Sequence, residues 1–382
     1  MKKAVHFGAG KIGRGFIAEL LHNSGYEIVF ADVSDALVDM IEEKHQYNLF
    51  LIDQDYKKKV IDSVSAYSTI KESEKVIAAI LDSDIITTSV MATNLSKIAP
   101  LIAEALKLRL KHKKEKVTIM ACENAMMGTT ILKNAMEDSG ILTKEELKEA
   151  AVFPNTAVDR MVFDGTHEGE PGVEIGKDFE LVIERLKLIN PESEPIKGAE
   201  YVDDLEMYLQ RKIFIINGGH AISGYVGYVN GAETVQDVIQ NKKLFEPVKQ
   251  AMLESAVALE KKYGFTHESL LDYIDKMMIR RFTSPGISDP ISRVAREPIR
   301  KISPDDRIMG PANLCEKYGL ENKWLLRGVA CAMHFENEED QQAVELQNYI
   351  TKHGIEDAIV KYTGVEKNGR MFCEILEEYK KY

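Results

Sequence analysis

The sequence predicts an α/β protein in two parts, a parallel sheet with added antiparallel strands followed by an all-helical domain. Over roughly the first 150 residues, short apolar runs alternate with segments of helical period, which is the order of βαβ units and a parallel sheet. Residues 173–183 then alternate with period two, which is typical of half-solvated antiparallel strands. From Asp203 onward almost every segment has helical periodicity. We therefore expect one domain over residues 1–195 and a second over residues 196–382.

Composition excludes several classes of function. The chain has 382 residues and a formal net charge of −12, so it is a poor partner for nucleic acid or an anionic membrane. Its four cysteines are scattered without a C-x-x-C pair, which is typical of reduced thiols rather than a zinc site. No run of about 18 apolar residues is present. We expect a cytoplasmic protein that acts on a small molecule without a metal, as a monomer or small homo-oligomer.

The N-terminus contains the pattern of a dinucleotide-binding site. The apolar strand Ala4–Phe7 leads into Gly8-Ala9-Gly10-Lys11-Ile12-Gly13, a G-x-G-x-x-G string, and a helical stretch follows. The first glycine permits a tight turn, the second lets a pyrophosphate approach, and the third allows helix and strand to pack closely. The free N–H groups and the dipole of the helix then favour bound phosphate. This order predicts a Rossmann-type domain.

The carboxylate that selects the cofactor is expected at Asp32. This residue ends the strand Ile28–Ala31 and lies 19 residues beyond Gly13, close to the spacing of about 20 for a ribose-binding acid. A carboxylate there accepts hydrogen bonds from a ribose 2′-OH and repels a 2′-phosphate, so we expect NAD rather than NADP. The alternative is an ordinary glycine-rich turn in which Asp32 caps a loop. The predicted cofactor-binding residues are Ala4, Val5, His6, Phe7, Gly8, Ala9, Gly10, Lys11, Ile12, Gly13, Arg14, Gly15, Asp32, Thr93 and Asn94.

Polar residues also follow two other predicted strands. The strand Asp84–Val90 ends near Thr93 and Asn94, and the strand Lys116–Met120 ends near Asn124. Ligands bind beyond the carboxyl ends of parallel strands, so these residues should line one crevice.

A further polar group lies in the first long helix of the second half. Lys212, Asn217 and His220 fall on one arc of an ideal helix, and two glycines, Gly218 and Gly219, interrupt it. Each glycine costs about 1 kcal/mol in a helix, so a ligand or a neighbouring backbone should approach closely there. If burial or nearby cations lower its pKa, the lysine can act as the base in metal-free alcohol oxidation while the amide holds an alkoxide. The alternative is a solvated lysine, a helix irregularity and a core histidine.

These residues resemble the polyol-specific long-chain dehydrogenases. The signature Lys212-x4-Asn217-x2-His220 is matched, and the resemblance extends over essentially the whole chain. The other matching strings are Gly8–Gly15, Glu123-Asn124, Val158-Asp159-Arg160, and the stretch from Arg281-Phe282 through Pro285 to Asp289.

The resemblance implies NAD-dependent, metal-independent interconversion of D-mannitol 1-phosphate and D-fructose 6-phosphate. Lys212 would be the general acid/base, Asn217 and Asn124 would stabilise the oxyanion, and His220 would contact substrate hydroxyls. Asp159 would be an acid near the site, or else a structural partner of its neighbour in the sequence, an arginine. The alternatives are dehydrogenases of unphosphorylated polyols, reductases of sugar acids, and an NAD-sensing regulatory protein.

A substrate phosphate requires a basic site, which we expect in residues 280–307. This stretch holds seven cations and four acids, in a chain whose net charge is −12. Asp289 should cap a helix that ends at Pro298, with the next basic residues on a loop beyond it. The alternative is a solvated face with local charge pairs. The residues predicted to bind the phosphate are Arg300, Lys301 and Arg307.

Overall fold

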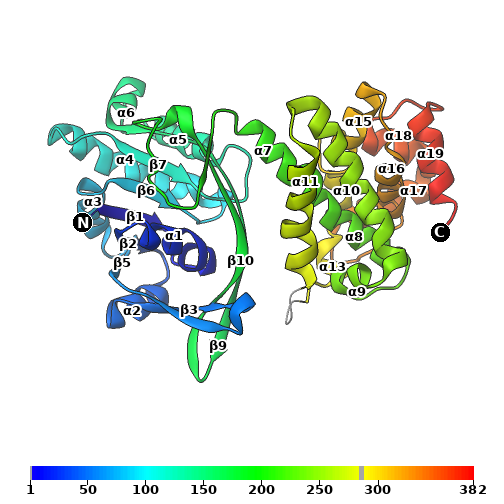
Figure 1. The fold of residues 1–382 in the computed structure, drawn as a ribbon. Helices are drawn as coiled ribbons and strands as arrows, with labels where there is room; N and C mark the ends of the chain where they lie inside the picture. Colours follow the sequence, from blue (N-terminus) through cyan, green and yellow to red (C-terminus); the bar gives the residue numbers. More distant parts are fainter. Residues whose placement is uncertain (1, 284–287) are drawn as a thin grey trace. The chain divides into compact units, whose positions relative to one another are not determined.

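The computed structural model describes residues 2–283 and 288–382 and divides into two compact units (Figure 1). The first unit, Met1–Leu205, carries two sheets with their helices, and the second, Glu206–Tyr382, is helical. The predicted parallel sheet, added strands and helical second part are confirmed.

The first unit is built on a six-stranded sheet in the order β5-β2-β1-β6-β7-β8, in which every neighbouring pair is parallel. Strand β1 lies between β2 and β6, and its side chains alternate between two cores. Ala4 packs on one face of the sheet, and Val5 and Phe7 pack on the other. The strands are β1 (Lys2–Phe7), β2 (Tyr26–Asp32), β5 (Val64–Ser68), β6 (Ile85–Thr88), β7 (Val117–Ala121) and β8 (Ala151–Val152).

Helices connect these strands, as the alternating pattern predicts. They are η1 (Gly13–Ile17), α1 (Ala18–Asn23), α2 (Asp35–Lys44), α3 (Ser73–Leu81), η3 (Ala92–Asn94), α4 (Leu95–Lys111), α5 (Gly128–Asp138) and α6 (Lys144–Ala150). Helix α6 begins with a capping box, in which Thr143 Oγ1 accepts the Glu146 N–H and Glu146 Oε2 accepts the Thr143 N–H.

A second, five-stranded sheet has the order β11-β10-β3-β4, with β9 paired to β10. Its strands are β3 (Tyr47–Leu51), β4 (Lys57–Ile61), β9 (Thr156–His167), β10 (Glu170–Glu184) and β11 (Glu200–Val202). The β9–β10 pair is antiparallel, as expected, but β10 is one long strand with a register shift between Ile175 and Phe179. Because β10 also pairs in parallel with β3 and β11, residues such as Val173 are buried and not half-solvated.

The second unit packs its helices around one hydrophobic core. In order, these helices are α7 (Glu206–Arg211), η5 (Lys212–Asn217), α8 (Gly218–Val229), α9 (Val235–Gln240), α10 (Lys242–Tyr263), α11 (His267–Ile274), η6 (Asp275–Arg280), α12 (Arg281–Thr283), α13 (Ile291–Val294), α14 (Pro298–Lys301), α15 (Met309–Tyr318), α16 (Lys323–Ala332), α17 (Gln341–His353), α18 (Ile355–Thr363) and α19 (Arg370–Tyr379).

A helix lies between Asp289 and Pro298 as expected, but its cap and its end were predicted wrongly. Pro290 is the N-cap residue of α13, which is a single turn, and Asp289 does not cap it. Pro298 begins the next helix, α14, because proline fits the first turn, where no intrahelical partner is needed for its missing N–H. Arg300 and Lys301 therefore lie on a helix and not on a loop.

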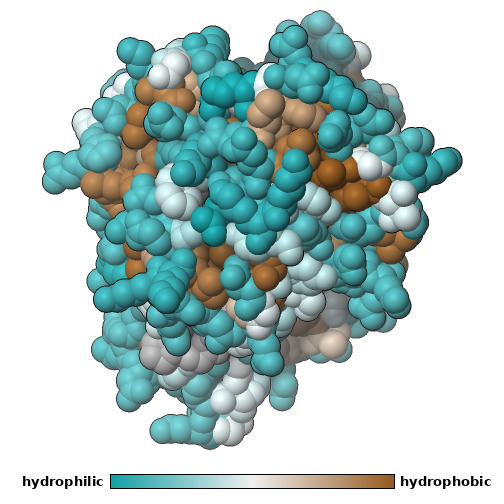
Figure 2. All heavy atoms as spheres, turned by 90° about the vertical axis from the view of Figure 1, so that its right-hand side faces the viewer, coloured by the Kyte–Doolittle hydropathy of each residue, from teal (hydrophilic) through white to brown (hydrophobic). Residues whose placement is uncertain are grey.

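Hydrophilic residues cover most of the face seen in Figure 2, and hydrophobic residues appear between them in separate patches. Scattered apolar exposure of this kind is ordinary for a folded chain. Among the described residues, no helix is both long and apolar enough to cross a membrane.

Candidate active site

The glycine-rich turn after β1 has the shape that a phosphate requires. Gly8 has φ +103°, and a Cβ there would lie 2.7 Å from the carbonyl oxygen of Ser89. A Cβ on Gly13 would overlap the carbonyl oxygen of Gly8, so glycine is needed for the turn to close. A Cβ on Gly10 would have no atom within 4 Å. The second glycine thus borders open space, as expected where a pyrophosphate approaches the backbone.

Cationic side chains of the turn are held by the β9–β10 hairpin. Arg14 is buried, and its Nε donates to the carbonyl of Ala9 at 2.7 Å. Its guanidinium lies 3.5 Å from the carboxylate of Asp164 on β9, and the ammonium of Lys11 lies 4.0 Å from the same carboxylate. The sequence did not indicate that the carboxylate of Asp164 would contact side chains of this turn.

Asp32 is joined directly to the turn. Its Oδ2 accepts the Ala9 N–H at 2.5 Å, and its Oδ1 accepts the Ser34 N–H at 2.8 Å. The side chain is half-buried at the carboxyl end of β2. The acid therefore stands beside the glycine-rich turn, where a ribose-binding carboxylate is expected.

The predicted cofactor residues on β1 are Ala4, Val5, His6 and Phe7, and each is at most 1% exposed. Their side chains are enclosed in the sheet and support the turn. His6 lies 2.7 Å from Thr87 Oγ1 through Nδ1 and 2.8 Å from Ser89 Oγ through Nε2. Burial lowers the pKa of His6 to about 3, so the imidazole is a neutral hydrogen-bonding group beneath the turn.

The remaining crevice residues follow β6 and β7, which are adjacent and parallel. Thr93 is exposed in the turn η3, and Asn94 donates to the carbonyl of Val90 at 2.7 Å. Asn124 is exposed just after β7. The structure thus brings these residues to one edge of the sheet.

Glu123, next to Asn124, links the two strand ends. Its Oε1 accepts the Thr88 hydroxyl at 2.6 Å and the Val90 N–H at 3.0 Å. Burial raises the pKa of Glu123 above its ordinary value. The carboxyl group therefore fixes the backbone from which Asn124 projects.

In the second unit, Lys212 and Asn217 begin and end the π-helix η5. A π-helix joins residues five apart, and the N–H of Gly218 donates to the carbonyl of Ile213. Five residues make about one turn of a π-helix, so Lys212 and Asn217 are separated by a smaller angle around the helix axis than they would be in an α-helix. Lys212 is only 7% exposed, which excludes the solvated alternative. Such π-turns are frequent at functional sites.

Close contacts with neighbouring segments explain why two glycines occur in this helix. A Cβ on Gly218 would lie 2.7 Å from the carbonyl oxygen of Arg307, and a Cβ on Gly219 would overlap Met252. The expected close approach of a neighbouring backbone is thus confirmed for Gly218. It places Arg307, a predicted phosphate-binding residue, against the helix that carries Asn217 and His220.

His220 is held by Asp289, to which the sequence assigned no role at the site. His220 Nε2 donates to Asp289 Oδ2 at 2.8 Å, and the ring lies 4.7 Å from that of Phe282. A carboxylate only accepts, so the imidazole carries its proton on Nε2 and presents Nδ1 as an acceptor. Burial lowers the pKa of His220 and outweighs the opposite effect of Asp289, so the ring is neutral near pH 7.

Asp289 is itself fixed on several sides. Its Oδ1 accepts both Nε and Nη2 of Arg293, and its N–H donates to Gln236 Oε1 at 3.0 Å. Although burial acts in the other direction, the bonds to His220 and Arg293 hold the pKa of Asp289 below its ordinary value. The one signal for this residue was its position at the end of a family string. Pro285, in the same string, lies outside the described residues.

Arg160 takes Glu19 as its carboxylate partner. Its Nη1 donates to Glu19 Oε2 at 2.6 Å, and its Nε donates to the carbonyl of Gly176 at 3.0 Å. Asp159 precedes it on β9, and successive residues of a strand point to opposite faces. The structure thus gives the arginine a different acid from the one that the sequence suggested.

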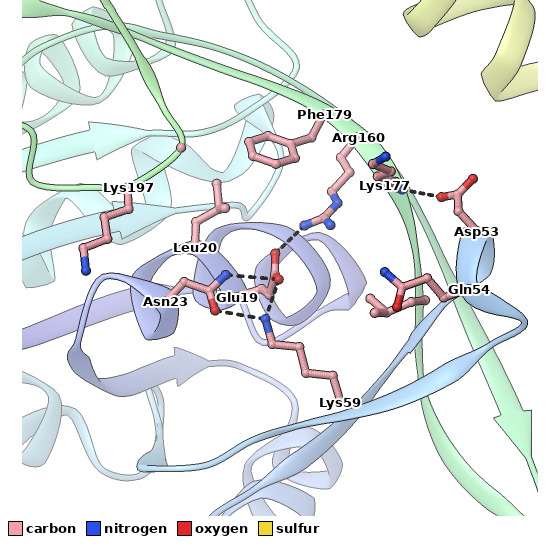
Figure 3. A pocket seen from close by; sticks show the side chains of 12 residues that line it. Glu19, Leu20, Asn23, Asp53, Gln54, Lys59, Arg160, Lys177, Phe179 and Lys197 are labelled. Carbon is pink, nitrogen blue, oxygen red and sulfur yellow. Dashed lines mark hydrogen bonds and ion pairs between the residues drawn. The ribbon is translucent and has the colours of Figure 1, made fainter.

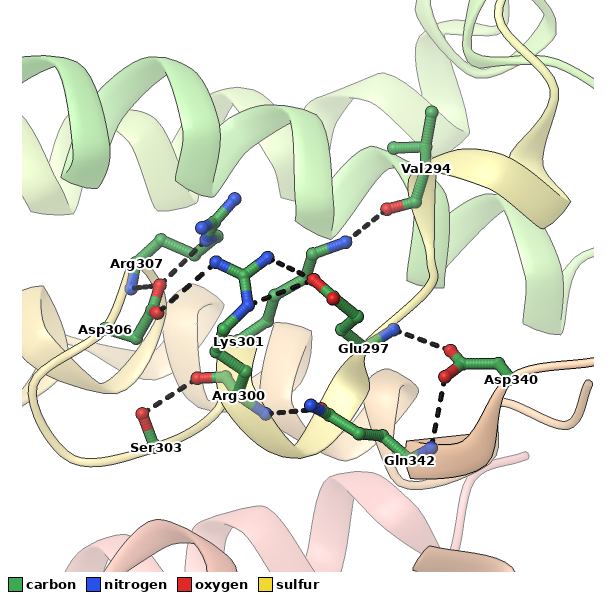
Figure 4. Close-up of polar contacts among 9 residues, drawn as sticks. All are labelled: Val294, Glu297, Arg300, Lys301, Ser303, Asp306, Arg307, Asp340 and Gln342. Carbon is green, nitrogen blue, oxygen red and sulfur yellow. Dashed lines mark hydrogen bonds and ion pairs between the residues drawn. The ribbon is translucent and has the colours of Figure 1, made fainter. Parts of the chain in front are cut away.

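The three residues predicted to bind phosphate lie close together (Figure 4). Arg300 pairs with Glu297, and Arg307 Nε donates to Asp306 Oδ1 at 2.7 Å. Lys301 is 7% exposed, and its Nζ donates to the carbonyl oxygen of a nearby residue at 2.6 Å.

The charge of Lys301 is not compensated in the same way. Within the described part of the chain, no carboxylate forms an ion pair with its ammonium. Burial, together with the nearby charges of Arg307 and Arg300, lowers the pKa of Lys301 to about 7. An anion bound at this cluster would stabilise the charged lysine.

The fold and these residues define a Rossmann-type dehydrogenase with a helical second domain. Two family models match the chain: the mannitol dehydrogenase Rossmann domain over residues 2–195, and the mannitol dehydrogenase C-terminal domain over residues 204–382. The chain belongs to the mannitol dehydrogenase family.

Several relatives match this chain over almost its whole length. The chain is 40% identical to the mannitol-1-phosphate 5-dehydrogenase of Thermoanaerobacter pseudethanolicus, over 100% of this chain and 98% of that protein. It is 39% identical to the enzyme of that name from Geobacillus stearothermophilus, over 98% of each chain. It is 38% identical to the enzyme of that name from Bacillus subtilis, over 98% of this chain and 99% of that protein. The resemblance seen in the sequence is confirmed.

Solved structures with low sequence identity to this chain share its fold. A D-sorbitol dehydrogenase in substrate-free form superposes with a TM-score of 0.83 at 17% identity, over 99% of this chain and 92% of that chain. The Pseudomonas fluorescens mannitol 2-dehydrogenase, solved with NAD and D-mannitol, gives 0.71 at 18% identity, over 100% and 90%.

Proposed function

We propose that the protein catalyses the NAD-dependent, metal-independent interconversion of D-mannitol 1-phosphate and D-fructose 6-phosphate. One observation carries the proposal. The helix that bears Lys212 and His220 packs at Gly218 against the backbone of Arg307, so a basic cluster adjoins a base, an amide and an imidazole. Relatives named mannitol-1-phosphate 5-dehydrogenase, about 40% identical over full length, support this choice of substrate.

NAD fits the first unit. The open space beside Gly10 admits a pyrophosphate, and the carboxylate of Asp32 is positioned to accept ribose hydroxyl bonds. When bound, NAD supplies the acceptor for the hydride that leaves the carbinol carbon. The same carboxylate repels the additional phosphate of NADP.

Lys212 acts as the general acid/base. In its neutral form its amine takes the proton of the substrate hydroxyl during oxidation, and its ammonium returns that proton during reduction. Asn217 donates a hydrogen bond to the developing alkoxide. The family resemblance supports the same role for Asn124. His220 accepts a hydrogen bond from an adjacent substrate hydroxyl through Nδ1. Asp159 stays a candidate acid of the site.

The phosphate is bound by Arg300, Lys301 and Arg307. Arginine binds phosphate through paired, charge-assisted hydrogen bonds, and lysine binds it as a point charge. The buried ammonium of Lys301, which has no carboxylate partner within the described residues, supports this assignment. A substrate phosphate would supply the missing negative charge.

Steady-state assays with mannitol 1-phosphate, mannitol and a sugar acid test the proposal. We expect oxidation of mannitol 1-phosphate with NAD, and unchanged activity after dialysis against a chelator. Lys212→Ala should lower kcat by on the order of 10²–10⁴ while NADH binding persists. Lys261→Ala, at an exposed lysine of the same unit, is the matched control. A preference for mannitol, activity restored by zinc after dialysis, or a Lys212→Ala variant that retains about a tenth of kcat would contradict it.

A further inference from the structure

A cavity of about 430 Å³ lies in the first unit (Figure 3). Residues of α1, β3, β4, β9 and β10 line it, together with those of the turns at 53–54 and 197–198. None of the glycines of the nucleotide turn is among them, and neither is Asp32. The volume is within the range of about 300–1,000 Å³ that is usual for small-molecule sites.

Part of the cavity lining is apolar. Leu20, Leu51 and Phe179 contribute to its lining. Arg160 lies over the ring of Phe179, with 5.1 Å between the guanidinium carbon and the ring centroid. Arg160 thus covers one face of the Phe179 ring, and a flat or extended apolar group can pack against the apolar part of the lining.

The charged residues of the lining are not balanced. They comprise four cations, Lys59, Arg160, Lys177 and Lys197, and two acids, Glu19 and Asp53, which leaves +2 in a chain of −12. Glu19 is already paired, at 2.7 Å with Lys59 and at 2.6 Å with Arg160. Asp53 accepts a backbone N–H, that of Lys177, at 2.6 Å.

Two ammonium groups remain for a ligand. The side chains of Lys177 and Lys197 are exposed, and neither ammonium has a hydrogen-bond or ion-pair partner in the part of the chain that the structure describes. In Figure 3 the two lysines lie on opposite sides of the view, with Leu20, Phe179 and the ion pair of Glu19 and Arg160 between them. Two separated positive charges, with apolar side chains and an already neutralised ion pair between them, complement a molecule with two anionic ends.

We propose that this cavity binds an elongated organic dianion, in which an apolar body joins two carboxylate or phosphate groups, and that its binding is coupled to that of the dinucleotide. The coupling has a physical route, since Arg160 Nη1 also donates to the carbonyl of Gly15 at 3.3 Å, within the helix that opens at the nucleotide turn. A ligand that draws Arg160 or Glu19 toward itself changes the contacts of this helix. The coupling is necessarily reciprocal.

Calorimetric titration of the full chain with naphthalene-2,6-dicarboxylate tests the site, and 2-naphthoate serves as the probe with one charge. We expect the dicarboxylate to bind at least about tenfold more tightly, because it makes a second charge-assisted contact. Lys177→Ala and Lys197→Ala should each reduce dicarboxylate affinity to that of the monocarboxylate. Lys57→Ala and Lys148→Ala, at exposed lysines of the same unit outside the lining, should leave it unchanged.

Three results would overturn the site: no binding by the wild type, equal losses in the control variants, or a loss in Arg300→Ala that points to the phosphate cluster. The coupling has its own readout on the same samples. The Kd of NADH should change about fivefold or more when the dicarboxylate is saturating, and should not change in Lys197→Ala. A wild-type Kd that stays constant would overturn the coupling.

Discussion

His220 and Asp289 are separated by 69 positions in the sequence and joined by a hydrogen bond of 2.8 Å between Nε2 and Oδ2. The carboxylate determines which nitrogen of the imidazole carries the proton, and Arg293 determines where the carboxylate lies. The orientation of the Nδ1 acceptor of His220 therefore depends on residues of a different segment.

We expect Asp289→Ala to lower kcat/KM by roughly 10- to 100-fold, because the hydrogen bond of a charged group contributes about 1.5–3 kcal/mol. Asp289→Asn should lie between this variant and the wild type, since the amide oxygen still accepts from Nε2. Arg296→Ala, at an exposed arginine of the same segment, is the control and should keep the wild-type value. Equal kcat/KM values for Asp289→Ala and the wild type would show that His220 needs no positioning.

Replacing Asp32 should relax the choice of cofactor. Asp32→Ala removes the ribose acceptor and the repulsion of a 2′-phosphate, so the ratio of kcat/KM for NAD to that for NADP should fall at least about tenfold. Asp35→Ala, a nearby carboxylate that instead pairs with Lys71, should leave the ratio unchanged. An unaltered ratio in Asp32→Ala would mean that this acid does not face the ribose.

Neutralising the basic cluster should affect phosphorylated substrates selectively. In the double variant Arg300→Ala/Lys301→Met, kcat/KM for fructose 6-phosphate should fall at least about tenfold, from loss of charge-assisted contacts, while that for fructose changes little. Arg296→Ala, an exposed arginine in the same segment, is the control. Equal losses on both substrates, or no loss on either, would locate the phosphate elsewhere.

Glu254 should make stability depend on pH. Its Oε1 and Oε2 accept the N–H groups of Trp324 and Leu325 at the start of α16, at 3.0 and 2.9 Å. Burial nevertheless raises the pKa of Glu254 from 4.5 to about 7. The folded state thus binds this proton more tightly than the unfolded state, so the contribution to stability is present below pH 4.5 and is lost as the pH rises through 7.

The loss from this one group is on the order of 3 kcal/mol, at about 1.4 kcal/mol per pKa unit. Denaturant unfolding between pH 5 and pH 8 should therefore show a steeper decline for the wild type than for Glu254→Gln, which cannot titrate. Glu246→Gln, at an exposed position of the same helix, should keep the wild-type slope. Parallel curves for the wild type and Glu254→Gln would contradict the assignment.

The sequence by itself determined the features that depend on neighbouring residues. The turn from Gly8 to Gly13 could be recognised because a glycine with positive φ starts it and a glycine beside open space admits a phosphate. Asp32 could be recognised because the strand β2 ends there. The order of strands and helices followed from periods of two and 3.6 residues. The spacing of Lys212, Asn217 and His220 matched a family signature over a single helix.

Tertiary structure decided the features that depend on distant segments. The π-turn at Lys212–Asn217 departs from the regular helix on which the spacing was judged, and it brings the lysine and the amide closer together. The single strand β10 and its burial depend on partners from β3 and β11, which its own alternation could not reveal.

The same holds for two of the charged groups. Lys301 is buried because α14 begins where the sequence suggested that a helix would end, and Asp289 reaches His220 only after the intervening chain has folded back. Local patterns fix backbone conformation through sterics and hydrogen bonds within a few residues. Which side chains meet, and which charges lose their water, depends on packing between segments far apart in the chain.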